Sequence, residues 1–402
     1  MNPDDTSTKR SQFLKTCLAF STKIREHEDE LMKLLVSYET HNTAEDEITR
    51  SLEVLAGAEA ELSPIKVPLE NLTIATFFPL NLPLYSLILF GVMPSIFSKN
   101  VFIRPPQVME EILARLWDIL EIPKYFPEVS LKIAPRHIFV DLYASESDVI
   151  IFTGKYENAL DIHKHCPYSL LLYNGSGVNP FLLFSNADVD LAAKKAVEMR
   201  CFNSGQDCAG PDAFIVPGSI REEFVKKLVY YLQEINVGNT TDPSTNVGPT
   251  VKESYITELS RWLNQDHGKI IYGGKIDTKN HFVYPTIALE KIAERTTDSF
   301  HEFFAPFFYV LEYASDAELE GIISLPKFKE RGMYVSVFGD NPAIEKQLDF
   351  VKILKNKIVN DVERGNEEYG GYGPKANFLL YGDQKVVKPV LVSRDIHVML
   401  AQ

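Results

Sequence analysis

The chain has 402 residues, 45% of them hydrophobic, and a formal net charge of −14. This length allows two domains, because single cores stop growing at roughly 250 to 300 residues. The acidic balance argues against a surface for nucleic acid or for an anionic membrane, so we expect neither partner.

The four cysteines, at positions 17, 166, 201 and 208, follow no CxxC or regular spacing. Neither a disulfide framework nor a metal site is therefore expected. The acidic start of the chain lacks the pattern of a secretory leader, and no apolar run approaches the length of a membrane helix. These features predict a cytoplasmic protein.

The first part of the chain predicts helices followed by a parallel sheet. From Lys9 to about Ala56, apolar residues recur at spacings of three and four, which is typical of two amphipathic helices. A connection over 57–69 follows. Strands are then expected over 72–78, 101–104, 129–133, 139–142 and 148–152, with helices over 84–97 and 108–120. Apolar strands separated by helices indicate βαβ units and a dinucleotide-binding architecture.

A second series of strands and helices follows, and it predicts another mostly parallel sheet. A strand over 178–183 leads to a helix from Asp188 into Cys201, capped by Ser185 or Asn186. Further elements are expected over 221–235, 251–264, 269–272, 307–310, 317–323, 332–338 and 357–360. A polar, acidic loop over 361–374 precedes closing strands over 377–381 and 388–399, which we expect to contact another subunit.

One polar segment carries a thiol immediately before an apolar run. It reads Asn203-Ser204-Gly205-Gln206-Asp207-Cys208-Ala209-Gly210-Pro211. A cysteine attacks as its thiolate, and a bend of small residues presents the sulfur beside backbone N–H donors that hold an oxyanion. The alternative is a buried structural cysteine at the start of a strand.

This segment resembles the Asn-x-Gly-Gln-x-Cys nucleophile loop of the aldehyde dehydrogenase superfamily. Other family landmarks match in the same order along the chain: Pro79-Leu80-Asn81-Leu82-Pro83, Phe152-Thr153-Gly154, Asn179-Pro180 with Asp188-Val189-Asp190, Gly248-Pro249, Gly273-Gly274-Lys275, Tyr284-Pro285-Thr286 and Glu302-Phe303-Phe304-Ala305-Pro306. The chain is identified as a shortened, divergent member.

The resemblance implies an α/β fold with two doubly wound, mostly parallel sheet domains. Residues 1–174 would form a Rossmann-like NAD(P)-binding domain and residues 175–365 the catalytic domain. Residues 366–402 would form a short closing or oligomerisation segment, and we expect a homodimer. The usual oligomerisation hairpin before the first strand is missing, so the subunit contacts are left open.

The resemblance also assigns roles to individual residues. Cys208 would be the nucleophile and Asn81 the side-chain donor to the oxyanion, although Asn81 also suits a turn between two prolines. Glu302 would hold the nicotinamide ribose, because a carboxylate accepts two hydrogen bonds, or it would be an exposed acid. Phe304 would pack beside the nicotinamide or belong to the core.

The nucleotide-facing positions depart from the family in ways that favour NADP alongside NAD. Arg104 stands where the family usually has a lysine near the adenine ribose, and Gln107 where NAD-preferring members carry glutamate. The arginine would pair with the 2′-phosphate of NADP, and the neutral residue near it would not repel that phosphate. Gly154 would let the backbone approach the ligand, and Lys155 would pair with the diphosphate or be a solvated turn lysine.

The most informative departure is Asn174, which stands where the family carries its general-base glutamate. An amide cannot take a proton from water at neutral pH, so hydrolysis of a thioacyl enzyme should be slow. We expect interconversion of an aldehyde and a thioester or other activated acyl group, with coenzyme A or a carrier protein as acyl partner. The alternatives are a hydrolytic aldehyde dehydrogenase with a substitute base and a catalytically impaired binding or scaffold protein.

Overall fold

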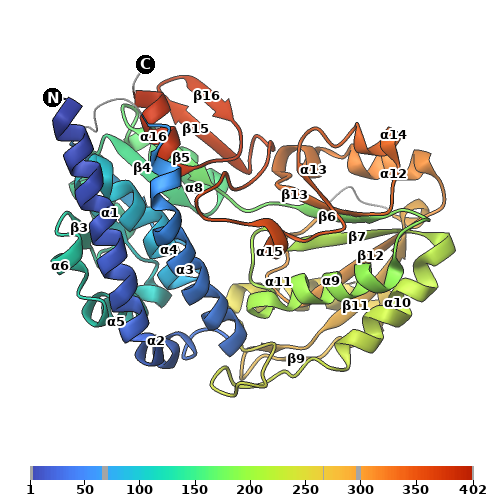
Figure 1. Cartoon of the computed structure of the whole chain (residues 1–402). Helices are drawn as coiled ribbons and strands as arrows, with labels where there is room; N and C mark the ends of the chain where they lie inside the picture. The colour runs from blue at the N-terminus through green and yellow to red at the C-terminus, as the bar shows by residue number, and fades with distance from the viewer. Residues whose placement is uncertain (1–2, 66–70, 266, 296–299, 401–402) are drawn as a thin grey trace.

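The computed structural model describes residues 3–65, 71–265, 267–295 and 300–400. Two mostly parallel sheets of seven strands each lie side by side, with helices packed against them (Figure 1). The predicted α/β fold with two sheets is thereby confirmed. No helix in the described part of the chain combines the length and apolar character needed to cross a membrane.

The first sheet has the strand order β16-β15-β5-β4-β1-β2-β3. Its parallel strands are β1 (Leu72–Phe77), β2 (Ser98–Arg104), β3 (Val129–Leu131), β4 (Val149–Thr153) and β5 (Leu170–Asn174). Because β2 and β4 lie on opposite sides of β1, the winding direction changes between β1 and β4. In open α/β sheets such a change leaves a ligand-binding crevice at the carboxyl ends of the strands.

Three helices, not two, precede this sheet: α1 (Pro3–Glu26), α2 (Glu28–Leu35) and α3 (His41–Leu62). The connection predicted from residue 57 is wrong over its first part, because α3 continues through Gly57. That glycine permits a close approach, since a Cβ there would lie 2.1 Å from Oδ1 of Asn366. Residues 66–69 of the predicted connection lie outside the described residues.

The helices between the strands of the first sheet contain two departures from expectation. The single helix expected over 84–97 is divided into α4 (Pro83–Leu87), a π-helical turn (Ile88–Val92) and a 3₁₀ turn (Met93–Phe97). The strand expected over 139–142 is wrong, because α7 (Arg136–Phe139) and a π-helical turn (Val140–Ala144) occupy that segment. Pro135 precedes α7, and proline suits the start of a helix because it needs no N–H partner there. The other helices are α5 (Glu110–Ile119), α6 (Ile122–Tyr125) and α8 (Tyr156–His165).

The second sheet has the order β14-β13-β6-β7-β12-β11-β8. Its strands are β6 (Asn179–Leu183), β7 (Pro211–Pro217), β8 (Ile270–Tyr272), β11 (Thr286–Lys291), β12 (Phe307–Tyr313), β13 (Tyr334–Phe338) and β14 (Lys352–Lys355), and a separate ribbon contains β9 (Ile276–Asp277) and β10 (Phe282–Val283). All neighbours in this sheet are parallel except β8 and β11. The helices are α9 (Val189–Cys201), α10 (Gly218–Leu232), α11 (Glu253–Gln265), α12 (Asp316–Ile323), α13 (Pro326–Arg331), α14 (Pro342–Glu345) and α15 (Val359–Val362).

Two local predictions in this half are wrong. The cap of α9 is Asp188 rather than Ser185 or Asn186, because its Oδ1 accepts a hydrogen bond of 3.0 Å from the backbone N–H of Leu191. The element expected over 357–360 does not match one element of the structure, because β14 ends at Lys355 and α15 begins at Val359. Asp361 accepts a hydrogen bond from the backbone N–H of Ile358 at 3.0 Å, and this bond stabilises the helical turn α15.

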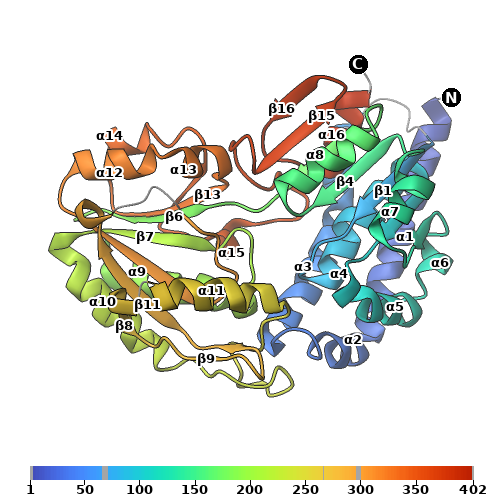
Figure 2. The same ribbon diagram turned by 180° about the vertical axis from the view of Figure 1, so that it is seen from behind.

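The last part of the chain returns to the first sheet. β15 (Asn377–Tyr381) pairs antiparallel with β5, and β16 (Gln384–Val387) pairs with β15, so these strands are internal to this chain. The strand expected over 388–399 is wrong, because α16 (Val392–Leu400) occupies it. Its buried Val392, Ile396 and Met399 recur at spacings of four and three, the period of a helix. Figure 2 shows α16 beside β15, at the end of the first sheet that β15 and β16 complete.

Candidate functional site

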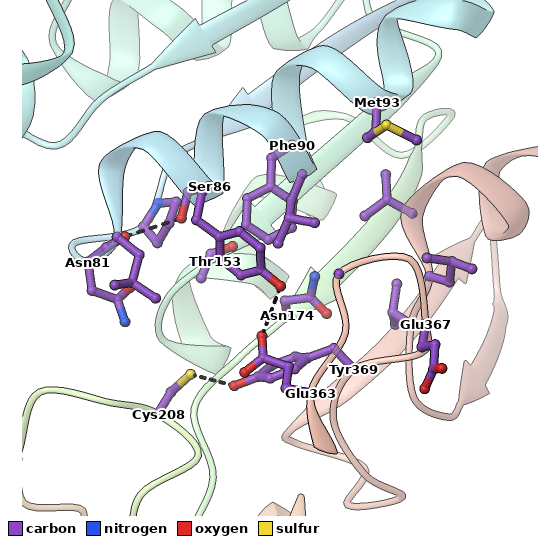
Figure 3. Close-up of a pocket in the computed structure, with 18 of the residues that line it drawn as sticks. Asn81, Ser86, Phe90, Met93, Thr153, Asn174, Cys208, Glu363, Glu367 and Tyr369 are labelled. Atoms are coloured by element: carbon purple, nitrogen blue, oxygen red, sulfur yellow. Dashed lines mark hydrogen bonds between the residues drawn. The ribbon is translucent and has the colours of Figure 1, made fainter. Parts of the chain in front are cut away.

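A pocket of about 870 Å³, solvent at its mouth included, opens where the chain crosses from β5 to β6. Asn81, Asn174 and Cys208 all line it, although they come from the turn after β1, the end of β5 and the loop before β7 (Figure 3). The three residues that the sequence predicts as catalytic are thus brought together. Arg104, Gln107, Gly154, Lys155, Glu302 and Phe304 do not line this pocket.

The loop before Cys208 has an unusual backbone. Asn203, Ser204 and Gly205 have φ angles of 46°, 58° and 76°, three successive residues in the left-handed region. This conformation costs non-glycine residues about 1–2 kcal/mol each. The hydroxyl of Ser204 accepts a hydrogen bond from the N–H of Gly248 at 2.8 Å, and this bond helps to hold the left-handed backbone in place. At Gly205 a Cβ would lie 2.3 Å from the carbonyl carbon of Ala305, so only glycine fits there.

Cys208 is the least buried of the four cysteines, all of which are free thiols. Its Sγ lies 3.1 Å from the hydroxyl oxygen of Tyr369. Burial raises the pKa of the thiol well above its ordinary value, the Asp207 carboxylate raises that pKa further, and the Tyr369 hydrogen bond lowers it. The thiol is therefore protonated at neutral pH in the protein alone.

Asn81 is held close to this loop. Its side-chain Nδ2 donates to the backbone carbonyl of Gln206 at 3.4 Å. The following residue, Leu82, has a φ of 49° and turns the chain into α4, which has no side-chain cap of its own. Instead Glu47 of α3 accepts a hydrogen bond of 2.8 Å from the backbone N–H of Tyr85. The N-terminal helices thus fix the helix that positions Asn81.

Asn174 occupies the pocket wall as a satisfied amide. It is 5% exposed, and its Oδ1 accepts a hydrogen bond of 3.2 Å from the side chain of Asn377 on β15. The carboxylate of Glu363 lines the same pocket. Its oxygens accept hydrogen bonds from Tyr85 Oη at 3.2 Å and from Arg50 Nη1 at 2.8 Å. Burial raises the pKa of Glu363, whereas the Arg50 guanidinium lowers it.

Sequence reasoning did not assign a role to Tyr369 or Glu363. Both lie in the loop over 361–374, which the sequence marks as polar and acidic, and Tyr369 directly precedes Gly370 and Gly371. Two adjacent glycines allow a chain to pass close to other backbone, which is a usable signal. A Cβ at Gly371 would lie 2.3 Å from the carbonyl oxygen of Met333, so this loop is packed tightly against the second sheet.

Four of the residues predicted to bind a nucleotide lie at the carboxyl edge of the first sheet. Arg104 ends β2, where its Nε donates to the carbonyl of Ala134 at 3.1 Å, and Gln107 is exposed beyond it. Gly154 follows β4 with a φ of 151°, and the exposed Lys155 precedes α8. These positions flank the change of winding between β1 and β4, where an open α/β sheet binds its ligand.

Glu302 is a mostly buried carboxylate, not an exposed acid. Its Oε2 accepts a hydrogen bond of 2.6 Å from Ser176, and Arg331 Nη2 lies 3.9 Å away. Burial and the Asp212 carboxylate raise the pKa of Glu302 to about 8. Its Oε1 has no hydrogen-bond partner among the described residues. A buried acceptor with an unused oxygen suits a ligand hydroxyl.

Phe304 is half-buried, and its ring stacks on Tyr255 with a centroid distance of 4.6 Å and an angle of 23°. The ring is therefore held by α11 at the end of the segment that carries Glu302. Ser176, which joins Glu302 to Arg331, is another contact that the sequence did not reveal, because Arg331 comes from the distant α13.

Comparisons with known proteins show the family to which the chain belongs. Residues 6–373 match the model of the aldehyde dehydrogenase family. Among curated proteins, the chain is 24% identical over 334 residues to a lactaldehyde dehydrogenase of Methanococcus aeolicus, covering 78% of this chain and 70% of that one. It is 25% identical over 252 residues to a cytosolic 10-formyltetrahydrofolate dehydrogenase of Xenopus laevis, covering 60% of this chain but only 28% of that longer protein.

A solved structure with the same fold is glyceraldehyde-3-phosphate dehydrogenase from Methanocaldococcus jannaschii in complex with NADP. The two chains superpose with a TM-score of 0.78 at 19% identity, over 98% of this chain and 95% of the other. At that identity the similarity establishes the fold.

Proposed function

Because the chain belongs to the aldehyde dehydrogenase family, we propose that it is an NAD(P)-dependent aldehyde oxidoreductase whose nucleophile is Cys208. The observation that carries this proposal is the convergence of Cys208, Asn81 and Asn174 on one pocket beside the carboxyl edge of the first sheet. The sulfur would bond to the aldehyde carbon while the carbonyl electron pair moves to the oxygen. The amide of Asn81 and the backbone N–H of Cys208 would stabilise that oxyanion.

The residues around the sheet edge fit a dinucleotide. Gly154 and Lys155 would lie at the diphosphate, and Arg104 and Gln107 at the adenine ribose. The Oε1 of Glu302, which has no hydrogen-bond partner within the described part of the chain, would bond to a ribose hydroxyl, with Phe304 packing beside the nicotinamide. A bound NAD(P) would supply the hydride acceptor. The side chain of Arg104 with the neutral Gln107 supports acceptance of NADP.

The fate of the acyl group on Cys208 follows from Asn174. This amide already accepts a hydrogen bond from Asn377 and cannot take a proton from water. We therefore propose that the acyl group passes to a thiol, such as coenzyme A or a carrier-protein arm, or that the chain reduces such an acyl group to an aldehyde. Transfer of the acyl group to a thiol requires no base as strong as a glutamate carboxylate at position 174.

Hydrolysis is the second candidate function, and one observation favours it. Glu363 is an ionisable carboxylate in the same pocket, and burial raises its pKa towards the range of an effective base. In this case Glu363 would activate the water that releases a carboxylic acid.

One set of assays separates these proposals. NAD(P)H formation would be measured with a panel of aldehydes, with and without coenzyme A, and NAD(P)H consumption with acyl thioesters, each also on Cys208→Ala. We expect thiol-dependent turnover that Cys208→Ala abolishes. Acid formation without a thiol would support hydrolysis, and failure to bind either cofactor would support a scaffold protein. A homodimer in the cytoplasm stays our prediction for its assembly and location.

A further inference from the structure

The thiol of Cys208 has a hydroxyl neighbour from a distant part of the chain. The Sγ of Cys208 and the Oη of Tyr369 are 3.1 Å apart, well within the reach of a hydrogen bond to sulfur (Figure 3). Both side chains line the pocket in which the aldehyde would react. An amide, Asn174, stands in this pocket where a carboxylate base is expected, so the thiol depends on other groups for its activation.

The Tyr369 hydroxyl is fixed independently of the thiol. The backbone N–H of Tyr369 donates to the carbonyl of Val390 at 3.0 Å, and the N–H of Val390 donates back at 2.9 Å. The ring also packs against that of Tyr334, with a centroid distance of 5.7 Å. Burial raises the pKa of Tyr369 well above its ordinary value. The hydroxyl therefore stays protonated and is able to donate its proton in a hydrogen bond to a thiolate.

The other ionisable groups around the thiol oppose its ionisation. The carboxylates of Asp207, Glu302 and Glu363 all raise the pKa of Cys208, and burial raises it most. Tyr255 and Tyr334 also interact electrostatically with the thiol. A thiolate formed here lies in a negative field, and a neutral donor at 3.1 Å compensates part of that cost.

We propose that Tyr369 is a catalytic residue: its hydroxyl donates a hydrogen bond to the Cys208 thiolate and holds it ready to attack the aldehyde. The thiol proton leaves to solvent through the open pocket. The sulfur electron pair then forms the bond to the carbonyl carbon, and the carbonyl π pair moves to the oxygen that Asn81 faces. Tyr369 keeps its own proton throughout. This role in the reaction rests on the proposed function.

The test measures thiolate formation without any substrate. The full chain is alkylated with iodoacetamide between pH 6 and pH 10, and the rate at Cys208 is followed by peptide mass spectrometry, while Cys17, Cys166 and Cys201 are buried. Tyr369→Phe removes only the hydroxyl. We expect alkylation at pH 8 to slow about tenfold, the change that a rise of about one unit in the pKa of Cys208 produces below that pKa. Tyr372→Phe, which removes an exposed hydroxyl from the same loop, is the matched control and should leave the rate unchanged.

An unchanged profile for Tyr369→Phe, or an equal slowing by Tyr372→Phe, overturns the proposal. A site-specific 3-fluorotyrosine at position 369 provides a second measurement in which the ring shape is kept. Its more acidic hydroxyl should speed alkylation, and a slower rate would also overturn the proposal. If Tyr369→Phe slows alkylation as expected but the natural chain oxidises no aldehyde, the thiolate role of Tyr369 stands and the proposed function fails.

Discussion

Cys201 and Cys208 lie close together in the sequence, yet their surroundings differ. Cys201 ends α9 inside the core, 5% exposed, and burial raises its pKa to about 12. Cys208 follows a loop of left-handed residues that opens it to a pocket, where Tyr369 and Asn81 are within reach. Burial raises the pKa of both thiols. A raised pKa therefore does not separate a structural from a reactive cysteine here, whereas access and neighbouring donors do.

Replacement of each thiol by alanine tests this contrast most directly. Cys208→Ala should lose aldehyde-dependent NAD(P)H formation by more than about a thousandfold, because no nucleophile is left. Cys201→Ala should keep its kcat and instead lower the free energy of unfolding by about 1 kcal/mol, since it removes buried packing. Steady-state assays and urea unfolding measure the two effects. Comparable activity loss in both variants would refute the distinction.

The next effect concerns Asn81, the side-chain donor proposed to stabilise the oxyanion that forms at Cys208. Asn81→Ala should reduce kcat by about a hundredfold to a thousandfold, the usual cost of one oxyanion donor. Its iodoacetamide rate should change little, because alkylation forms no oxyanion. Asn203→Ala would be a poor control, since the backbone of Asn203 is left-handed. Asn158→Ala on α8 suits better, because Asn158 does not line the pocket. A small loss of kcat would remove Asn81 from the mechanism.

A smaller effect of opposite sign is expected at Glu363. This carboxylate raises the pKa of Cys208, so Glu363→Gln should lower that pKa and speed alkylation of Cys208 by about threefold at pH 8. Cys201, which is closed to solvent, should not respond. Rates measured by peptide mass spectrometry decide the sign. If Glu363→Gln also abolishes acid release from a thioacyl enzyme, Glu363 acts as the hydrolytic base.

The last prediction is a pH dependence of stability, which leaves the rates at Cys208 and Cys201 aside. The pKa of Glu302 is about 8 in the folded chain, above its ordinary value of 4.5, so the native state binds this proton more tightly than the unfolded state. Its stabilising contribution is complete below about pH 4.5 and is lost as the pH rises through about 8. The free energy of unfolding, measured by urea without cofactor, should fall by at most about 1.4 kcal/mol per pH unit from this group. Glu302→Gln should reduce the dependence of the free energy of unfolding on pH. An identical dependence in the natural protein and the variant would contradict this prediction.

The sequence predicted the fold well where periodicity is long and apolar. The alternation of strands and helices from β1 to β3 was correct in order because buried parallel strands read as continuous apolar runs. Short segments failed: 139–142 and 388–399 are apolar enough for strands, but their buried residues recur with a helical period. Local propensity alone cannot separate these cases.

For the site, the resemblance identified Cys208, Asn81 and Asn174, and the structure brings them to one pocket. The adjacent glycines after Tyr369 signal a close approach of the loop over 361–374, but they do not show that Tyr369 and Glu363 reach the pocket, because that depends on how the loop packs. Nor could the sequence reveal that Ser176 bridges Glu302 and Arg331, since those three residues come from separate elements. Contacts of this kind depend on tertiary packing rather than on spacing.

The pairing of β15 with β5 has a consequence for biosynthesis. Residues 377–381 form the neighbour of a strand that ends at Asn174, so the first sheet is unfinished while most of the chain has already left the ribosome. Until then, Leu170–Asn174 presents an unpaired backbone edge, the kind of surface at which nascent chains associate wrongly. The first sheet is therefore expected to need protection by chaperones until residues 377–381 have been synthesised and can pair with β5.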